Sequence, residues 1–273
     1  MIHEHDNDVK LCKNRKIDEI RPLKEKFKYK FTHSSILLGV SLVNLLKDCA
    51  KQEDVSKGRS IHADIITKGL LKDNVYIGSA LIHMYAKCGS LTEAQEVFDK
   101  LLVRDVVTWN TLIAGYVQHG YGERALNCFE QMQGEGISAT SVTFVCILKA
   151  FGILGASEKG QEVHLEVVKL GMLQNDILLG SALLDMYCKC GEIVKAQEVF
   201  DDLCFRDVVS WTSLISGYAD HEYGEEALDY FGKMQKEGVY PNMVTFVCVL
   251  KACGCIGALV RGKEIHQEIR RKG

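Results

Sequence analysis

Three short motifs carry side chains that bind zinc in other proteins. One residue separates His164 from Glu166, as in the His-x-Glu that forms the first half of a zinc deaminase signature. Two Cys-x-Cys pairs follow, at Cys188 and Cys190 and at Cys253 and Cys255. The deaminase signature also requires a downstream Pro-Cys-x-x-Cys, which the sequence lacks. Strong zinc sites combine two correctly spaced pairs of Cys or His ligands, and neither Cys-x-Cys pair has a second ligand pair at such a spacing. We therefore predict no metal site.

The same cysteines and histidines are better interpreted as structural. Residues two apart on a helix point to different faces, so the Cys-x-Cys pairs are expected to be buried thiols. His62, His164 and His266 recur at one spacing and are expected to be packing or polar-face residues. No Gly-rich loop follows a strand, and no Ser-His-Asp set with a nucleophile elbow is present. The sequence predicts no catalytic residue and no cofactor.

Composition favours a soluble, helical protein. The apolar share is 47% and the charged share 25%, and only 2 prolines interrupt 273 residues. No apolar run approaches the roughly 18 residues of a membrane span. The 11 cysteines lie within apolar helical patterns and no signal peptide precedes them, which indicates reduced thiols rather than a disulfide framework.

The chain repeats itself at an offset of 102 residues. Residues 94–99 (AQEVFD) recur as 196–201, and residues 104–107 (RDVV) recur as 206–209. Identity at one constant offset indicates an internal duplication. Such duplications are typical of repeat architectures, in which each unit packs only on its neighbours.

Each block contains three helical units. In residues 75–105, Leu81, Ile82 and Tyr85 fall at helical spacing, Gly89 interrupts the pattern, and a second amphipathic segment starts at Leu91. Each unit is predicted to be a first helix, a turn and a second helix. The expected all-α fold is a right-handed solenoid of roughly fourteen helices, with the first helices on its concave surface. The units are expected at 39–74, 75–105, 106–140, 141–176, 177–207, 208–242 and, incomplete, 243–273.

Several independent motifs in these units agree in order. They are residues 85–89 (YAKCG), 187–191 (YCKCG), 107–113 (VTWNTLI) and 144–150 (FVCILKA). With unit lengths that cycle through 36, 31 and 35 residues, the chain resembles plant pentatricopeptide repeat proteins of the long/short/standard subclass. The fixed 34-residue tetratricopeptide pattern does not fit. The resemblance implies organellar binding of single-stranded RNA, one base per unit. Members of this subclass resemble site-recognition factors for cytidine-to-uridine editing in chloroplasts and mitochondria.

The resemblance also implies which side chains read bases, two from each unit. Carried onto this chain, the pairs are Ser79 with Asp105, Asn110 with Thr140, Ser181 with Asp207 and Thr212 with Asn242. The alternative for small polar residues at such positions is helix capping. Recurrence in every short and standard unit favours base reading.

Donors and acceptors of these pairs predict a base order. Both Ser/Asp pairs should select guanine, Thr212 with Asn242 adenine, and Asn110 with Thr140 a pyrimidine. With the parallel polarity that the resemblance implies, the expected 5′ to 3′ preference from Ser79 onward is G, pyrimidine, unspecified, G, A.

The long units differ at the reading position, where they carry Val43, Val145 and Val247. Valine offers no hydrogen bond, so these units are expected to space or stack rather than read. A second position, which sandwiches successive bases in the family, holds Tyr76, Val107, Leu178 and Val209. Core packing explains these four almost equally well. Trp109, Trp211, Tyr116 and Tyr218 are expected in the inter-helix core, each indole N–H with a partner.

The net charge of −3 counts against nucleic-acid binding, although a local basic stripe on a neutral surface remains compatible with it. Residues 1–38 are expected to be a charged, flexible leader that matches a transit peptide only weakly. By resemblance, the expected location is a mitochondrion or chloroplast, and the expected partners are single-stranded RNA and a deaminase or other editing factor in trans. The alternative function is a helical scaffold that binds proteins, which the acidic pI of about 6.3 would suit.

Overall fold

The computed structural model describes residues 33–71, 74–173 and 176–272, which contain helices and no strand. The first helices of the seven units are α2 (His33–Gln52), α4 (Val75–Lys87), α6 (Val106–Gln118), α8 (Ser141–Leu154), α10 (Ile177–Lys189), α12 (Val208–Asp220) and α14 (Met243–Cys255). The second helices are α3 (Val55–Thr67), α5 (Leu91–Lys100), α7 (Gly122–Gly134), α9 (Ser157–Lys169), α11 (Ile193–Asp202), α13 (Gly224–Lys236) and α15 (Leu259–Lys272). The expected all-helical repeat fold is confirmed.

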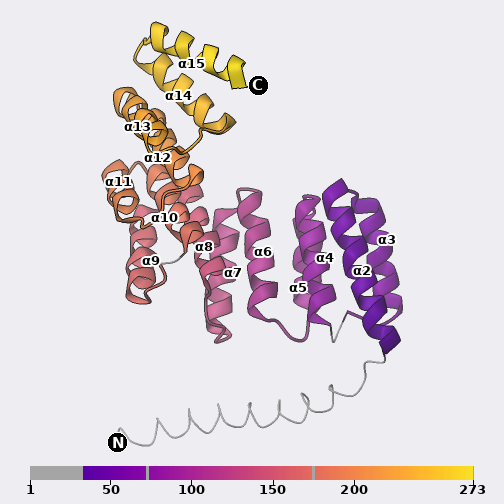
Figure 1. Ribbon diagram of the computed structural model, residues 1–273. Helices are drawn as coiled ribbons and strands as arrows, with labels where there is room; N and C mark the ends of the chain where they lie inside the picture. The colour runs from indigo at the N-terminus through magenta and orange to yellow at the C-terminus, as the bar shows by residue number, and fades with distance from the viewer. Residues whose placement is uncertain (1–32, 72–73, 174–175, 273) are drawn as a thin grey trace, which may run out of the picture.

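The helices form two layers (Figure 1). Each first helix packs on the first helices before and after it, whereas each second helix packs on its own first helix and, up to α13, on the next one. Among the described residues, second helices do not pack closely on one another, although polar side chains connect some of them, as Arg59 of α3 does with Glu93 of α5. Neighbours that touch directly lie on the shorter arc of a curved stack, so the first helices form the inner layer and the second helices the outer layer.

The helix boundaries follow from capping residues and glycines. Asp105 and Asn242 directly precede α6 and α14, and each side chain accepts a hydrogen bond from a backbone N–H of the first turn. Gly89 separates α4 from α5 at a φ of 75°, and Gly136 follows α7 at 76°. An L residue is strained there, so glycine terminates these helices at little cost.

The core between the layers is apolar and aromatic. Trp109 and Trp211 are each 1% exposed, and each indole meets a phenylalanine of the preceding outer helix edge to face. The ring centroids are 4.5 Å apart for Trp109 and Phe98, and 4.7 Å apart for Trp211 and Phe200. The expectation that each indole N–H has a hydrogen-bond partner is wrong, because neither Nε1 atom has one in the described part of the chain. Apolar packing, and not a hydrogen bond within the described residues, therefore holds both indoles.

Neighbouring inner helices approach closely at a glycine. A Cβ added to Gly217 would lie 2.4 Å from the Sγ of Cys188, and one added to Gly115 would lie 2.8 Å from the Cβ of Ala86. Neither distance is compatible with a side chain, so these two glycines set the spacing between successive inner helices.

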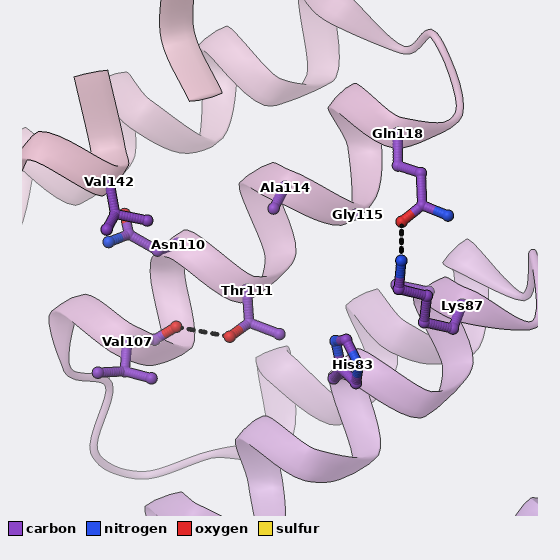
Figure 2. Close-up of a pocket in the computed structure, with 10 residues that line it drawn as sticks. His83, Lys87, Val107, Asn110, Thr111, Ala114, Gly115, Gln118 and Val142 are labelled. Atoms are coloured by element: carbon purple, nitrogen blue, oxygen red, sulfur yellow. Dashed lines mark hydrogen bonds between the residues drawn. The ribbon is translucent and has the colours of Figure 1, made fainter. Parts of the chain in front are cut away.

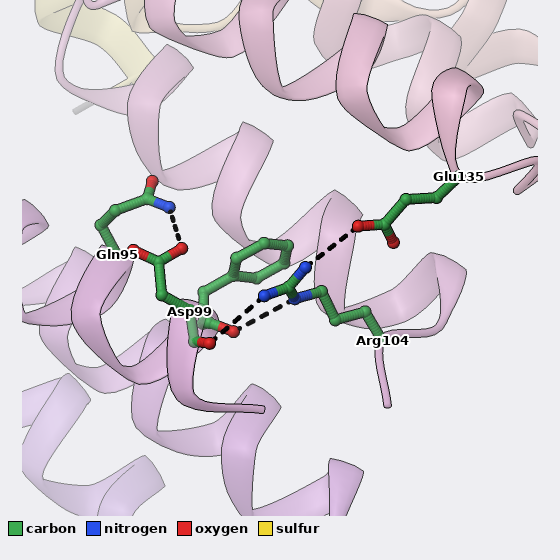
Figure 3. A network of polar contacts seen from close by, with 5 residues as sticks. Gln95, Asp99, Arg104 and Glu135 are labelled. Atoms are coloured by element: carbon green, nitrogen blue, oxygen red, sulfur yellow. Dashed lines mark hydrogen bonds and ion pairs between the residues drawn. The ribbon is translucent and has the colours of Figure 1, made fainter. Parts of the chain in front are cut away.

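Arginines at the unit boundaries tie the outer layer together (Figure 3). Arg104 donates to the carbonyl oxygens of Phe98 and Asp99, both at 3.3 Å, and its Nη1 lies 3.0 Å from Glu135 Oε1, just past the end of α7. The guanidinium also stacks over the Phe98 ring, 4.7 Å from its centroid. One side chain thus satisfies the last carbonyls of one outer helix and contacts the next.

The structure corrects two expectations, one on the N-terminal leader and one on the Cys-x-Cys thiols. Helix α2 begins at His33, so residues 33–38 of the expected leader are helical, and the remainder of that leader lies outside the described residues. Cys188 and Cys253 are buried as expected, whereas Cys190 is half-buried and Cys255 is exposed, so the buried-thiol interpretation is wrong for Cys255. No described helix is long and apolar enough to cross a membrane.

The repeated histidines are packing or polar-face residues, as expected. His62 Nδ1 lies 2.9 Å from the hydroxyl of Tyr85, and His164 Nδ1 lies 3.0 Å from that of Tyr187. Each contact joins an outer helix of a long unit to the next inner helix. His266 is exposed. Within the described residues, no group of three or more His, Cys, Asp or Glu side chains is placed to hold a metal ion.

Candidate nucleic-acid interface

A row of exposed apolar side chains runs along the inner layer. Each belongs to the second residue of an inner helix, and their exposed fractions lie between 50% for Val209 and 83% for Tyr76. The members of this row are Tyr76, Val107, Val142, Leu178, Val209 and Val244. Side chains this exposed do not pack in the core, so the core interpretation of Tyr76, Val107, Leu178 and Val209 is wrong in this structure.

Lysines share the face of this row. At 100° per residue, the ninth and thirteenth positions of a helix lie within about 20° of the second position. These positions hold Lys149 and Lys251 in long units and Lys87 and Lys189 in short units, and all four side chains are exposed. Lys251 reaches Asp220 on the preceding inner helix at 2.6 Å, as expected for side chains on one shared surface.

Charge is divided unequally between the layers. Helices α2, α4, α6, α8, α10, α12 and α14 together carry six lysines and three aspartates. The outer helices α3 through α13 carry nine basic and fifteen acidic residues, and the last outer helix, α15, carries five basic and two acidic residues. The acidity of the whole chain thus arises largely on the outer layer, while the inner layer has a net positive charge. Overall charge therefore does not describe the inner face.

A cavity of about 410 Å³ opens on this face between α4, α6 and α8 (Figure 2). Its lining includes Val107 and Val142 from consecutive row positions, Asn110 of the second reading pair, and Lys87 with His83 from the preceding unit. This volume lies within the range of about 300–1,000 Å³ typical of small-ligand sites. Burial, followed by the charges of Lys87 and Lys47, lowers the pKa of His83, so its imidazole is neutral near pH 7. Two aliphatic walls, a polar amide and a cation thus meet in one cavity.

The first members of the reading pairs lie at the fifth position of their inner helices. Ser79 is half-buried, while Asn110, Ser181 and Thr212 are between 7% and 9% exposed. Three of the four contact a hydroxyl on the next inner helix: Ser79 with Thr108, Asn110 with Thr143 and Thr212 with Thr245. The fourth, Ser181, has no hydrogen-bond partner for its Oγ in the described part of the chain.

The second members of the pairs are the residues that immediately precede the next inner helix. Asp105 Oδ1 accepts from Thr108 N at 2.8 Å, and Asp207 Oδ1 accepts from Ser210 N at the same distance. Asn242 Oδ1 accepts from the backbone N–H of Thr245 at 2.9 Å. These residues are therefore helix caps, as the alternative interpretation holds.

Capping uses only one of the two polar side-chain atoms of Asp105, Asp207 and Asn242. Oδ2 of Asp105, Oδ2 of Asp207 and Nδ2 of Asn242 form no hydrogen bond with any described residue. The Asn242 orientation is fixed by its hydrogen bonds, because its inward atom accepts from two donors. The two aspartates thus retain a spare acceptor and Asn242 a spare donor. Capping and base reading are compatible, since they use different atoms.

The last residue of the long unit 141–176 lacks such a spare atom. Asp176 Oδ1 accepts from Leu179 N at 3.0 Å, and its Oδ2 accepts from the hydroxyl of Ser141. Both oxygens are therefore engaged within the array. Together with Val145 at the reading position, this arrangement leaves the long unit without a free polar pair.

Several residues of this face were absent from the sequence-based set. Val142 and Val244 occupy the second position of long units, and the repeat offset could have located them from their alignment with the exposed row. The inner-face lysines could have been found from helical register once the first helices were placed. The hydroxyls that contact the reading residues could have been found from their recurrence, because Thr108, Thr143 and Thr245 hold the same position in their helices.

Comparisons with known proteins identify the architecture. The PPR repeat family matches residues 104–152 and 206–255, and the single PPR repeat matches residues 79–106 and 181–208. The chain belongs to the pentatricopeptide repeat family. The matches together span more than half of the chain.

Relatives and solved structures agree with this assignment. The chain is 38% identical over 226 residues to pentatricopeptide repeat-containing protein At4g18520, chloroplastic, and 39% identical over 233 residues to At3g09040, mitochondrial, both from Arabidopsis thaliana. These alignments cover 83% and 85% of this chain but only 36% and 22% of the relatives. The chain thus spans about a third or less of their length.

A crystal structure of the pentatricopeptide repeat protein PPR10 in complex with an 18-nt psaJ RNA element has the same fold. The TM-score is 0.72 at 23% identity, over 85% of this chain and 35% of that one. A crystal structure of PPR10 from maize matches with a TM-score of 0.53 at 19% identity, over 92% of this chain and 41% of that one.

Proposed function

We propose that this pentatricopeptide repeat array binds single-stranded RNA along its inner layer and reads bases with its short and standard units. One observation carries the proposal: exposed apolar side chains recur on one face of successive inner helices, and hydrogen-bonding side chains and the lysines of long and short units lie beside them. The protein of similar fold, PPR10, was crystallised with RNA, which supports the same ligand class here.

Each component of the face suits a part of a nucleotide. Exposed apolar side chains such as Val107 and Val142 border a cavity in which a base can insert between them. Lysines of the ninth and thirteenth positions supply charge for phosphates, which bind basic side chains in a salt-dependent manner. The spare atoms of Asp105, Asp207 and Asn242 supply hydrogen bonds to base edges. Base edges are accessible only in unpaired RNA, so single strands should be preferred over duplex.

The proposed base order follows the chemistry of the spare atoms. Oδ2 of Asp105 or Asp207 can only accept, which matches the N1–H and N2 donors of guanine. Nδ2 of Asn242 donates, which matches the N1 acceptor of adenine. Asn110 beside Thr140 is the bulkier pair and is assigned to a pyrimidine. The resulting preference is 5′-G, pyrimidine, any base, G, A-3′.

The unit lengths of 36, 31 and 35 residues support placement in the long/short/standard subclass and a role in recognising cytidine-to-uridine editing sites. In this proposal the array positions RNA, and a separate deaminase, in cis on a longer chain or in trans, performs the chemistry. Relatives named as chloroplastic and mitochondrial support action in one of these organelles.

The first test measures binding of the purified chain to a fluorescent RNA that contains the predicted five-base order, at near-physiological salt. We expect tighter binding than to the same bases in scrambled order or to a perfect duplex. Equal affinity for all three would overturn sequence-dependent binding. A chain that binds no RNA but captures a folded protein partner would favour the scaffold alternative, which the acidic outer layer would suit.

The second test replaces Asn242 by Asp. The cap should persist, because Asp105 and Asp207 cap equivalent helices through a carboxylate oxygen. The outward donor becomes an acceptor, so preference at the last base should move from adenine toward guanine by about 1–3 kcal/mol, the size of a mismatched polar contact. Competition between RNAs that differ only at this base measures the shift. An unchanged preference would show that Thr212 and Asn242 do not form a reading pair.

A further inference from the structure

The third residue of each inner helix distinguishes the units that are proposed to read from those that are not. After short and standard units, this residue carries a hydroxyl: Thr108, Thr143, Ser210 and Thr245. After the long units 39–74 and 141–176, it is Ile77 and Leu179. The hydroxyl is thus present wherever the reading position of the preceding unit is polar and absent wherever that position is valine.

Helix capping does not require this hydroxyl. Asn74 caps α4 by accepting from the backbone N–H of Ile77 at 3.2 Å, and Asp176 caps α10 by accepting from that of Leu179 at 3.0 Å. The same backbone contact forms at Thr108 and Thr245. Apolar and hydroxylated residues therefore support the same cap, and burial is similar, since Ile77 is 1% exposed and Thr108 0%. The hydroxyl has another role.

The hydroxyl of Thr108 connects the two members of one reading pair. Thr108 Oγ1 donates to Asp105 Oδ1 at 2.7 Å, because a carboxylate only accepts. The single Thr108 proton is thereby used, so Ser79 must be the donor in its 3.2 Å contact with Thr108 Oγ1. The Ser79 proton points inward, and its oxygen presents only lone pairs to a ligand. Such an oxygen can accept from guanine but cannot donate to adenine.

The second short unit has the same reading residues and a different connection. Ser210 Oγ donates to the backbone oxygen of Asp207 at 2.9 Å rather than to its carboxylate. Ser181 Oγ is left buried without a partner in the described part of the chain. Nothing holds the Ser181 proton in one direction, so this hydroxyl can donate to adenine or accept from guanine when it turns toward a base.

We infer that the third-position hydroxyl of the following inner helix is a positioning residue that couples the two reading side chains, and that its contact sets how strictly a unit selects its base. Units 75–105 and 177–207 carry identical Ser and Asp pairs but differ in selectivity, because Thr108 fixes the proton of Ser79 and Ser210 leaves Ser181 free. The inference rests on the proposed RNA binding.

The experiment measures the ratio of affinities for G and A at the first and fourth bases of the five-base RNA. In the unchanged chain, we expect the G over A ratio to be about fivefold larger at the first base, the size of one neutral hydrogen bond. Thr108→Val should reduce the first ratio to the level of the fourth and leave the fourth unchanged. Ser210→Thr should raise the fourth ratio and leave the first unchanged. Helicity and the unfolding midpoint of both variants show whether each variant folds.

The outcomes separate two failures. Equal ratios at the two bases of the unchanged chain, or ratios that neither variant alters, would overturn the positioning role while RNA binding stands. Absence of RNA binding by the unchanged chain would overturn the proposed function. If Thr108→Val does not fold, Ser210→Thr decides alone, because it adds a methyl group at a position where Thr108, Thr143 and Thr245 already stand in equivalent helices.

Discussion

The inner and outer layers are built from the same repeat and have opposite surface chemistry. Inner helices expose valine, leucine, tyrosine and lysine on one face, whereas outer helices through α13 expose more carboxylates than cationic side chains. Only the inner helices pack directly on one another, so only their faces join into a continuous surface. A ligand that spans several units can therefore be bound by the inner layer, while the outer layer mainly completes the core.

If the outer layer acts mainly through the core, the residue that joins the layers should have the largest effect on stability. Trp211→Ala removes an indole that is 1% exposed and packs on Phe200 of α11. We expect a loss of about 3–5 kcal/mol in the free energy of unfolding, as for other buried aromatics. Val194→Ala on α11 is the control, because Val194 is 73% exposed and its truncation should cost little. Denaturant unfolding measures both, and equal losses would contradict the assigned core.

The charge division should appear in RNA affinity. Replacing Lys87, Lys149 and Lys251 together by Gln removes three inner-face cations. We expect affinity to fall at least about tenfold. The plot of log affinity against log salt should become shallower by about 2, because each lost phosphate contact on a single strand reduces the magnitude of the slope by roughly 0.7. Electrophoretic mobility shift or fluorescence anisotropy across a salt series measures both quantities.

The matched control for the lysine variant lies on the outer layer. Lys100, Lys159 and Lys236 are exposed on α5, α9 and α13, and their replacement by Gln changes the net charge by the same amount. Their loss should leave the salt slope unchanged. If inner and outer variants weaken binding equally, only overall charge matters and the inner face is not the binding surface.

The sequence was sufficient for the fold. A duplication at constant offset, glycines at the turns and a cap before each inner helix are local signals, and local signals define a solenoid in which all contacts are between neighbours. The choice between core and surface for Val107 or Tyr76 could not be made locally. Both faces of an inner helix are apolar, and only the placement of adjacent helices shows which face remains exposed.

The polar details depended on side-chain geometry. The sequence showed Asp105 as either a cap or a reader, and the structure shows that its two oxygens are not equivalent. It also gave no reason to separate Ser79 from Ser181, since their pairs are identical. The difference arises at one hydroxyl on a neighbouring helix, where Thr108 in the first block corresponds to Ser210 in the second. The sequence shows this change of residue type, but only the structure shows that the two hydroxyls have different acceptors.

The tie between outer helices should contribute less than the aromatic core. Arg104→Gln removes the hydrogen bonds to Phe98 O and Asp99 O and the contact with Glu135. We expect a loss of about 1–2 kcal/mol in the free energy of unfolding, because the last carbonyls of α5 lose a charged donor. Arg261→Gln is the control, since its ion pair with Glu264 lies within one exposed helix, where such pairs contribute little. Equal effects of both variants would contradict the tie.

The smallest expected effect concerns the histidines that join the two layers. Burial lowers the pKa of both His62 and His164, so the folded array favours their neutral forms. Stability from this source is present above the unfolded pKa of about 6.5 and is lost as the pH falls from there through the folded pKa. Protonation would charge an imidazole whose Nε2, in His62, is buried without a partner in the described part of the chain.

The measurement is the unfolding midpoint at pH 7.5 and pH 5.5 for the unchanged chain and for His62→Gln with His164→Gln. Acid should lower the midpoint of the unchanged chain more than that of the double variant, because glutamine cannot gain the proton. His266→Gln is the matched control, since His266 has the same place in its unit but is exposed. Its variant should keep the full acid sensitivity. A double variant as acid-sensitive as the unchanged chain would show that neutral histidines do not help to hold the outer layer on the inner one.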